Sequence, residues 1–354
     1  MTLISIVDNV KTSISETKAD VKCEFLNFLQ AGDTHKKLKL IEGTTIPFKL
    51  NGVRYLYKTK MDIVIDTIAA LDTGNTLAAG KDYSVYLCVK DNNVKFVVSL
   101  NGTYPAGYSA LTAYKIGGFH TECKGVTADN APALKAGSFW TAHPAIGYAD
   151  GDIIPNSIWC LTHRPVADPN GMVYIDRLGK WVDIYLQSGT GKNTTSAYAA
   201  TITDSRQPIL HQLDLDTVNK KMLTDNDFLV ASEGSNQGTN ITGSADPVTT
   251  GGHVDTAGKR MISGYFLEDC CGVEWQWLDE LGFDTQTNWQ SYGTNASDRG
   301  QSYGMPKVLL AGGNWLHGGF CGSWSRNCNC TRTHVAANSG CRGASLPLFT
   351  GKVA

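Results

Sequence analysis

The stretch Leu309-Leu-Ala-Gly-Gly-Asn-Trp315, followed further on by Gly340-Cys-Arg-Gly-Ala344, is the part of this chain from which its fold is best predicted. Gly, Trp and Arg recur through this region and are interleaved with small and polar residues. We interpret the recurring residues as a structural frame: Gly312, Gly313, Trp315, Trp324, Arg326, Gly340 and Arg342. Between Asn314 and Arg342 there is no Lys, Glu, Gln, Met, Asp or Pro, although the chain uses all six elsewhere.

The genetic code offers one explanation for this restricted set of residues. Randomising both adenines of an AAC asparagine codon gives NNC codons, which cannot encode Lys, Glu, Gln, Met or Trp. NNC codons can encode the residues that lie between the frame positions: Leu316, His317, Phe320, Cys321, Ser323, Ser325, Asn327, Cys328, Asn329, Cys330, Thr331, Thr333, His334, Ala337, Asn338 and Ser339. The alternative is chance in a short, Gly-rich segment. The pattern favours a surface whose side chains are varied over a site whose side chains are kept.

Length, composition and charge exclude several classes of protein. A chain of 354 residues is long enough for two or three domains, and its 42% hydrophobic and 18% charged residues are typical of globular proteins. A formal charge of -2 gives no electrostatic case for binding nucleic acid. The N-terminus lacks the pattern of a signal peptide, and no apolar run is long enough to cross a membrane. We therefore expect a soluble protein, made in the cytoplasm, that neither binds nucleic acid nor inserts into a membrane.

The ten cysteines are scattered along a large chain, which does not favour a disulfide framework. Cys88 and Cys160 lie in apolar, strand-like runs and are predicted to be buried thiols. Cys328 and Cys330, together with Cys321 and His334, could be drawn as a zinc site, but their spacing matches no strong zinc pattern. We expect most of the cysteines to be reduced.

The N-terminal part of the chain is predicted to be mostly β. Residues 36–125 contain alternating apolar and polar runs around the dipeptide Asn51-Gly52 and again around Asp91-Asn-Asn93, which are signals for β-hairpins. This spacing favours a β-sandwich or a small barrel. Residues 1–35 are expected to form a helix or an extended arm for attachment or oligomerisation, and residues 126–150 to form a linker.

The C-terminal part, residues 151–354, contains many Trp, Gly and turn residues and one clear helix signal. In the segment Leu223–Gly234, Thr224 is predicted to cap a helix with Asp227 as its capping-box partner, and Gly234 is predicted to end it. Residues 234–258 are rich in Gly, Ser, Thr and Asn and are expected to form a long loop.

Several segments of residues 150–349 together resemble the formylglycine-generating-enzyme-like proteins, which have a C-type-lectin fold. Lys221–Gly234 is similar to a helix of that family, and Gly272-Val-Glu-Trp-Gln-Trp277 is similar to its Gly-Asn-Val-Trp-Glu-Trp strand. Leu310–Trp315, Cys321–Arg326 and Gly340–Gly343 resemble its terminal Gly, Trp and Arg series. The resemblance implies an α+β, mostly β chain that ends in a C-type-lectin-like domain, and it adds Trp275 and Trp277 to the frame.

The family includes an enzymatic branch and a branch of variable proteins of diversity-generating retroelements, such as phage tropism determinants. The enzymes hold copper with a cysteine pair, for which Cys328 and Cys330 are the candidates, but their spacing departs from the enzyme pattern. Cys341 also stands where an aromatic residue usually precedes the arginine. The Glu-Pro-Asn, Gln-Pro-Asp and Trp-Asn-Asp motifs of calcium-dependent lectins are absent. We therefore expect no catalytic residue, no metal and no cofactor.

The resemblance to the variable proteins implies a virion receptor-binding protein whose residues 312–342 form a variable region. In this interpretation a bacterial surface protein or glycan and other virion proteins are the partners, and the chain is a homotrimer on a tail fibre, assembled in the host cytoplasm. The alternatives are an oxidase of the enzymatic branch or a structural decoration of the virion. The frame tryptophans are expected to be buried, and Arg326 and Arg342 to bind loop carbonyls. The residues expected to contact the receptor are Leu316, His317, Phe320, Ser323, Ser325, Asn327, Asn329, Thr331, Thr333, His334, Ala337 and Asn338.

Overall fold

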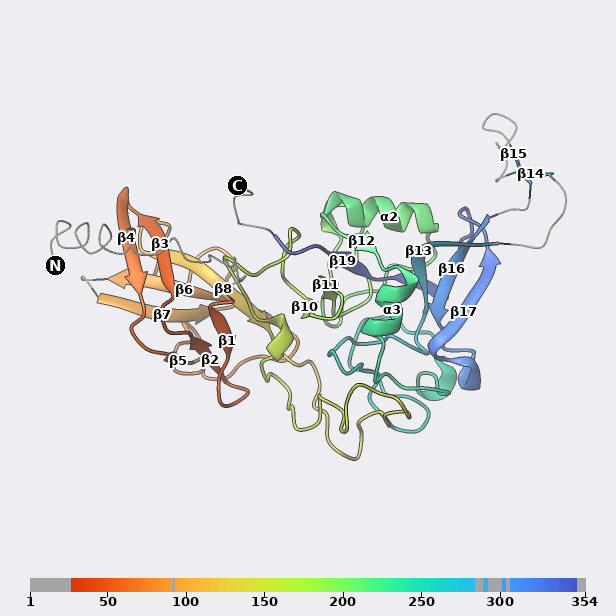
Figure 1. Cartoon of the computed structure of the whole chain (residues 1–354), viewed down its shortest axis with the longest axis horizontal. Helices are drawn as coiled ribbons and strands as arrows, with labels where there is room; N and C mark the ends of the chain where they lie inside the picture. The colour runs from red at the N-terminus through yellow and green to blue at the C-terminus, as the bar shows by residue number, and fades with distance from the viewer. Residues whose placement is uncertain (1–26, 91–92, 284–288, 292–300, 304–305, 349–354) are drawn as a thin grey trace, which may run out of the picture.

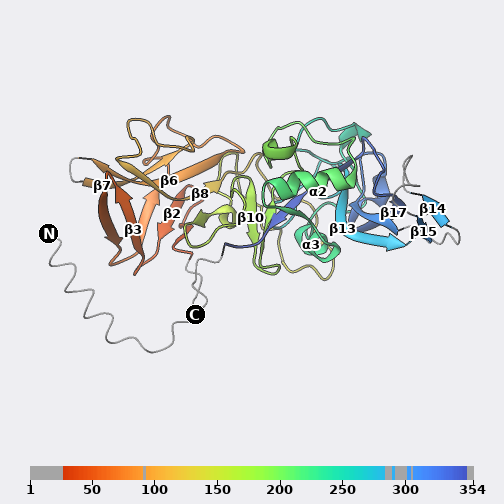
Figure 2. The same ribbon diagram turned by 90° about the horizontal axis from the view of Figure 1, so that it is seen from above.

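The computed structural model describes residues 27–90, 93–283, 289–291, 301–303 and 306–348. The chain forms two units that lie side by side along the long axis of the molecule (Figures 1 and 2). The N-terminal unit is made of strands, and the C-terminal unit combines two small sheets with two helices and long irregular segments. The fold is therefore mostly β with a C-type-lectin-like C-terminal unit, as the sequence predicted.

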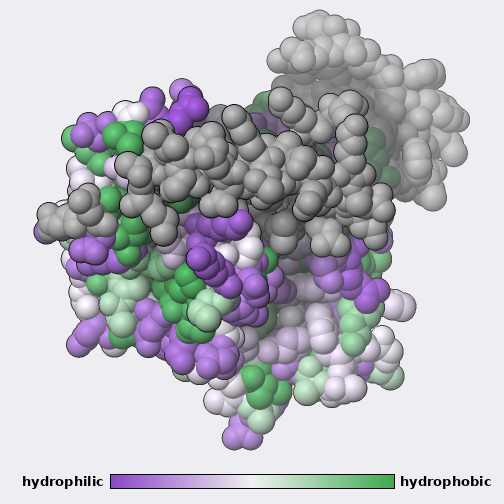
Figure 3. Space-filling model, turned by 60° about the vertical axis from the view of Figure 1, so that its left-hand side comes forward, coloured by the Kyte–Doolittle hydropathy of each residue, from purple (hydrophilic) through white to green (hydrophobic). Residues whose placement is uncertain are grey.

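The described part of the N-terminal unit contains three antiparallel sheets around a shared core. One sheet has the order β1-β2-β5, one is the hairpin β3-β4, and one has the order β7-β6-β8-β9. The strands are β1 (Leu29–Ala31), β2 (Lys37–Leu40), β3 (Thr45–Leu50), β4 (Val53–Lys58), β5 (Ile63–Asp66), β6 (Asp82–Lys90), β7 (Asn93–Ser99), β8 (Ala113–His120) and β9 (Trp159–Cys160). Side chains from all three sheets meet in the core. On the face shown in Figure 3, hydrophobic and hydrophilic residues are interspersed.

Both predicted hairpins are present. Asn51 and Gly52 have φ angles of 46° and 78°, the left-handed pair that a two-residue type I′ turn requires, and Leu50 pairs with Val53 across it. Strands β6 and β7 pair up to Lys90 and Asn93, while residues 91–92 of their turn lie outside the described residues.

The C-terminal unit contains two four-stranded sheets, with the orders β10-β11-β19-β12 and β17-β16-β13-β18. All neighbouring strands are antiparallel except β13 and β18. The strands are β10 (Met172–Ile175), β11 (Lys180–Asp183), β12 (Lys221–Met222), β13 (Trp275–Phe283), β16 (Pro306–Gly312), β17 (Gly322–Cys330), β18 (Ser339–Cys341) and β19 (Gly343–Ser345), and a separate pair is formed by β14 (Trp289–Ser291) and β15 (Gln301–Tyr303). The short 3-10 turns are η1 (Pro155–Ser157), η2 (Gly191–Asn193), η3 (Thr242–Ser244) and η5 (Gly318–Phe320).

The predicted helix is α3 (Asp225–Ala231), and its capping box is formed as expected. The Thr224 hydroxyl accepts a hydrogen bond from the Asp227 backbone, and the Asp227 carboxylate accepts one from Thr224 N. A second helix, α2 (Pro208–Thr217), was not predicted. Its N-cap residue, Gln207, is not one of the residue types that usually cap a helix, and its side chain makes no capping bond. No helix among the described residues is long and apolar enough to cross a membrane.

The limits of the domains differ from those predicted. Strand β1 belongs to the N-terminal unit although it falls within the expected arm, whose residues 1–26 lie outside the described residues. The expected linker, 126–150, contributes Val126, Ala131 and Ala145 to the core of the C-terminal unit. Its small apolar residues fill gaps beside larger side chains, so that a composition typical of a linker is found in a packed segment.

The Arg342 side chain joins the two sheets of the C-terminal unit. It lies between β18 and β19 and is 1% exposed. Its Nη1 donates to the carbonyls of Asp183 and Ile184 at 2.8 and 2.5 Å, its Nη2 donates to the carbonyl of Glu268, and its Nε donates to Gln276 Oε1 at 3.2 Å. One guanidinium therefore fixes the end of β11, the segment before β13, and β13 itself.

Replacing Arg342 with alanine should destabilise the C-terminal unit. The change removes the guanidinium that donates to three backbone carbonyls and to the side-chain oxygen of Gln276 in a buried site. We therefore expect a loss of about 3 kcal/mol or more in the free energy of unfolding. Urea unfolding of the full chain measures this loss. The matched control is Arg332→Ala, because Arg332 is exposed. Equal stability of the two variants would contradict the role of Arg342.

Candidate binding surface

Strand β17 and the segments on either side of it carry most of the predicted contact residues. The strand lies at the edge of its sheet, with β16 on one side. Three large apolar side chains of this region are strongly exposed: Leu316 by 66%, Phe320 by 79% and Trp324 by 84%. Exposed aromatic side chains of this size are typical of surfaces that bind a partner.

The structure reverses the predicted roles of Ser323 and Trp324. Ser323 was expected to contact the receptor, but it is 7% exposed. Its backbone NH donates to Gln237 Oε1 at 3.0 Å, and Gln237 Nε2 donates to its hydroxyl at 3.1 Å. Trp324 was expected to be buried in the frame, but its ring is in solvent. Successive side chains of a strand point to opposite faces, so burying Ser323 exposes Trp324.

Two tryptophans of β13 pack against two of the predicted contact residues. Trp275 is 7% exposed and Trp277 is fully buried. The rings of His317 and Trp275 make a T-shaped contact, with their centroids 5.4 Å apart. The rings of His334 and Trp277 make a contact of the same kind, with their centroids 6.3 Å apart. Each histidine is therefore positioned by a tryptophan that packs in the core.

A shallow hollow of 480 Å³ lies on this surface. It is lined by Trp275, Phe320, Ser325, Arg326, Asn327, Cys328 and Asn329. Two of these residues, Trp275 and Arg326, belong to the frame, and Phe320, Ser325, Asn327 and Asn329 are predicted contact residues, so that changes in the contact residues would alter the shape of the hollow.

Arg326 and two glycines hold the backbone of the region. Arg326 Nη1 donates to the carbonyls of Ser323 and Ser325, both at 2.8 Å, and its Nε is paired with Asp225 of α3. Gly312 and Gly313 have φ angles of 93° and 84°, and a Cβ on Gly313 would lie 2.7 Å from the sulfur of Cys321. Only glycine fits these two positions without strain.

The remaining frame residues are buried. Trp315 is 8% exposed. Its backbone NH donates to the carbonyl of Val273 at 3.0 Å, and its backbone carbonyl accepts a hydrogen bond from the Asn240 side chain. Gly340 lies so close to Glu274 that an added Cβ would be 2.3 Å from the carboxylate.

The other predicted contact residues vary in exposure. The exposed ones are Asn329, Thr333, His334 and Ala337, and the partly exposed ones are His317, Ser325, Asn327, Thr331 and Asn338. The prediction did not include Arg332 and Val335, which are also exposed. Their position between Thr331 and Ala337 was the signal that could have identified them.

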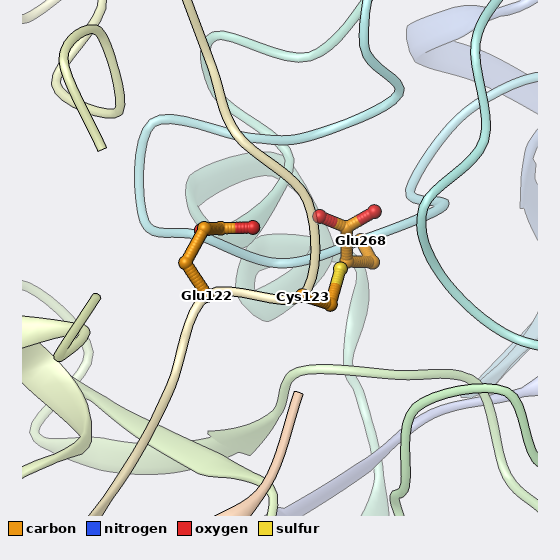
Figure 4. A group of neighbouring side chains, drawn as sticks. All are labelled: Glu122, Cys123 and Glu268. Atoms are coloured by element: carbon orange, nitrogen blue, oxygen red, sulfur yellow. The ribbon is translucent and has the colours of Figure 1, made fainter. Parts of the chain in front are cut away.

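The cysteine and histidine side chains of the region do not come together as metal ligands. Cys321 is buried and donates to the carbonyl of Asn314, whereas Cys328 is exposed. Among the described residues, the group within ligand distance of one another is Glu122, Cys123 and Glu268, which is buried (Figure 4). A guanidinium already occupies this group, because Arg260 Nη2 donates to Glu268 at 2.5 Å and lies 3.8 Å from Glu122 and from the sulfur of Cys123. A cation there would have to displace Arg260.

Comparison with known proteins agrees with this architecture. Residues 29–160 match the family model described as "Mtd second domain". The tail fiber receptor-binding protein of Bordetella phage BPP-1 is 30% identical over 264 residues, which cover 68% of this chain and 64% of that protein. The match thus spans just under two thirds of the relative's length.

Solved structures extend the likeness to both units. The M1 variant of the major tropism determinant is 25% identical, with a TM-score of 0.72 over 94% of this chain and 86% of that chain. The chain is similar to the major tropism determinants over both of its units. The U1 variant has the same TM-score at 24% identity, over 96% of this chain and 88% of that chain, which shows that the two share a fold.

The exchanged roles of Ser323 and Trp324 give a paired prediction. Ser323→Val should lower the free energy of unfolding by about 1 kcal/mol, because the half-buried Gln237 Nε2 loses the Ser323 hydroxyl, one of its two acceptors, and the valine side chain cannot replace it. Trp324→Ser should change it by no more than about 0.5 kcal/mol, because the ring is in solvent. Urea unfolding of both variants is the measurement, and a larger loss in Trp324→Ser would show that the ring is part of the core.

The buried acidic pair should make stability depend on pH. Burial and the neighbouring Glu268 raise the pKa of Glu122 from 4.5 to about 8. Because the folded chain then binds more protons than the unfolded chain, this group stabilises the fold below pH 4.5, and the contribution is lost as the pH rises through 8. Glu122→Gln should flatten the measured dependence of unfolding free energy between these values. The exposed control Glu42→Gln should keep the wild-type profile.

Proposed function

We propose that this chain is the receptor-binding protein of a phage virion and that its β17 region contacts the surface of a bacterium. The observation that carries the proposal is the separation between a buried frame and a set of exposed side chains on the same short segment. Arg342 and Trp315 hold the fold from within, whereas Phe320 and Trp324 have most of their surface in solvent. Such a segment can change its partner without changing its fold.

The composition of the region supports variation as its role. Small, polar and aromatic residues alternate there with frame positions, and the residues between the frame positions fit NNC codons. The contact set consists mainly of Ser, Thr, Asn and His, which are weaker anchors than Trp, Tyr and Arg. We therefore propose modest affinity for each copy, strengthened by display of several copies, which raises avidity by about 10²–10⁴.

The N-terminal unit supports assembly with other chains. Among the described strands, β4 pairs with β3 alone, and it carries the exposed side chains Val53, Tyr55 and Leu56, with exposed fractions of 49%, 37% and 44%. An edge strand with apolar side chains is an unusual feature for a surface that faces only water. We propose that this unit makes the contacts of a homotrimer or of attachment to the tail fibre, which would place the β17 region at the outer end.

Binding rather than catalysis is the activity that we assign. Cys328 and Cys330, the candidate pair for an oxidase, lie on an edge strand, and Cys328 is exposed. The hollow beside them is open and shallow rather than an enclosed cleft. We therefore propose that the chain has no enzymatic role and needs no cofactor.

Adsorption of phage that carry variant chains tests the proposal. Phe320→Ser combined with His334→Ser should reduce adsorption to host cells at least tenfold, because exposed aromatic anchors dominate such contacts. The melting temperature of the purified chain should stay unchanged, since neither residue is buried. Val64→Ser, on the N-terminal unit and 56% exposed, is the matched control and should adsorb normally.

The outcome also separates the proposal from a purely structural role in the virion. A decoration protein would tolerate the paired change without any loss of adsorption. Normal adsorption by the Phe320 and His334 variant would therefore contradict receptor binding by this surface.

A further inference from the structure

A second, polar hollow of 260 Å³ is lined in part by Trp324. It is smaller than the roughly 300–1,000 Å³ of pockets for drug-sized ligands, and its size suits a single small ring. Its lining residues come from three segments: residues 133–138, residues 233–237, and the strand residues Ser323 and Trp324. The hollow is therefore formed mostly by parts of the chain outside the predicted variable region.

The backbone that carries Trp324 is anchored at the edge of this hollow. Gln237 fixes the preceding residue through two hydrogen bonds, and Arg326 binds the carbonyls of Ser323 and Ser325 on either side of Trp324. The backbone is thus anchored while the indole remains 84% exposed. An anchored backbone loses little further conformational freedom on binding.

Two charged side chains in the lining are available to a ligand. Lys135 and Glu233 both line the hollow, and within the described residues neither side chain has a hydrogen-bond or ion-pair partner. The Lys135 ammonium is a donor of hydrogen bonds, and the Glu233 carboxylate is an acceptor. The hollow therefore offers an aromatic face, a donor and an acceptor around a space for one ring.

We infer that this hollow is a saccharide subsite that binds one pyranose ring of a bacterial surface glycan. A pyranose has a face of C–H groups, which packs on an indole, and a rim of hydroxyls, which both donate and accept hydrogen bonds. An aromatic surface with a few convergent polar groups is typical of a small-molecule site. The inference rests on the proposed receptor-binding function and adds the class of ligand.

The subsite should stay constant while the neighbouring surface varies. The single tryptophan codon, TGG, contains no adenine, so adenine-directed mutation leaves Trp324 unchanged. Lys135 and Glu233 lie outside residues 312–342. The subsite therefore supplies a contact that all variants share, and the hollow lined by Phe320 and Ser325 supplies the contact that differs.

Saturation-transfer NMR with the full chain tests the subsite directly. The probes are the methyl pyranosides of glucose, galactose, mannose and N-acetylglucosamine, each at millimolar concentration. We expect transfer to the ring C–H protons of at least one of them, reduced at least fivefold in Trp324→Ala and in Glu233→Gln. Trp324→Phe should restore part of the signal. Val64→Ser, on the N-terminal unit and outside the binding surface, should keep the full signal.

Each other outcome overturns the subsite. No transfer from any of the four sugars, or equal transfer in Trp324→Ala, would contradict it. If the sugars fail and Trp324→Ala still reduces adsorption, the hollow binds a protein side chain, and the receptor-binding function stands. If adsorption is also unchanged in the Phe320 and His334 variant, the proposed function itself fails.

Discussion

The buried guanidinium of Arg342 is the interaction on which the C-terminal unit depends. It binds three backbone carbonyls and one side-chain amide from segments that are far apart in the sequence, and it lies directly between β18 and β19. These two short strands insert the end of the chain into both sheets. Because the sheets are joined by one fixed group in the interior, the edge strand β17 does not need its outward side chains for stability. The outward side chains of β17 can therefore be replaced without loss of the hydrogen bonds of Arg342 in the core.

The alternation of side chains along β17 determines which residues can vary. An inward residue such as Ser323 is fixed by Gln237, whereas the next residue points into solvent. Buried and exposed residues are therefore neighbours at the start of β17, and Arg326 and Gly313 hold the backbone there. One hollow is lined mainly by residues 320–329, and the other mainly by residues 133–138 and 233–237. Under the proposed function, the first hollow would supply the contact that changes and the second the contact that stays constant.

The sequence predicted the elements that depend on local chemistry. The Asn51-Gly52 turn and the capping box of α3 follow from residues that are neighbours in the chain. Long-range packing was harder to predict. The segment 126–150 has the composition of a linker yet fills the core, and the orientation of Trp324 depends on strand register, which a motif of Gly, Trp and Arg does not determine. The position of Lys135 beside Trp324 could not be predicted from the sequence, because it depends on the packing of that same segment.

Saturation mutagenesis of residues 306–345, read out as the yield of folded full-length chain, tests the separation of frame and contact residues most directly. The account predicts that tolerance to substitution follows side-chain exposure residue by residue: Trp324 and Phe320 should accept most side chains, while Ser323, Gly313 and Arg342 should accept few. Tolerance that is uniform along the segment, or that is low at Trp324 and high at Ser323, would contradict it.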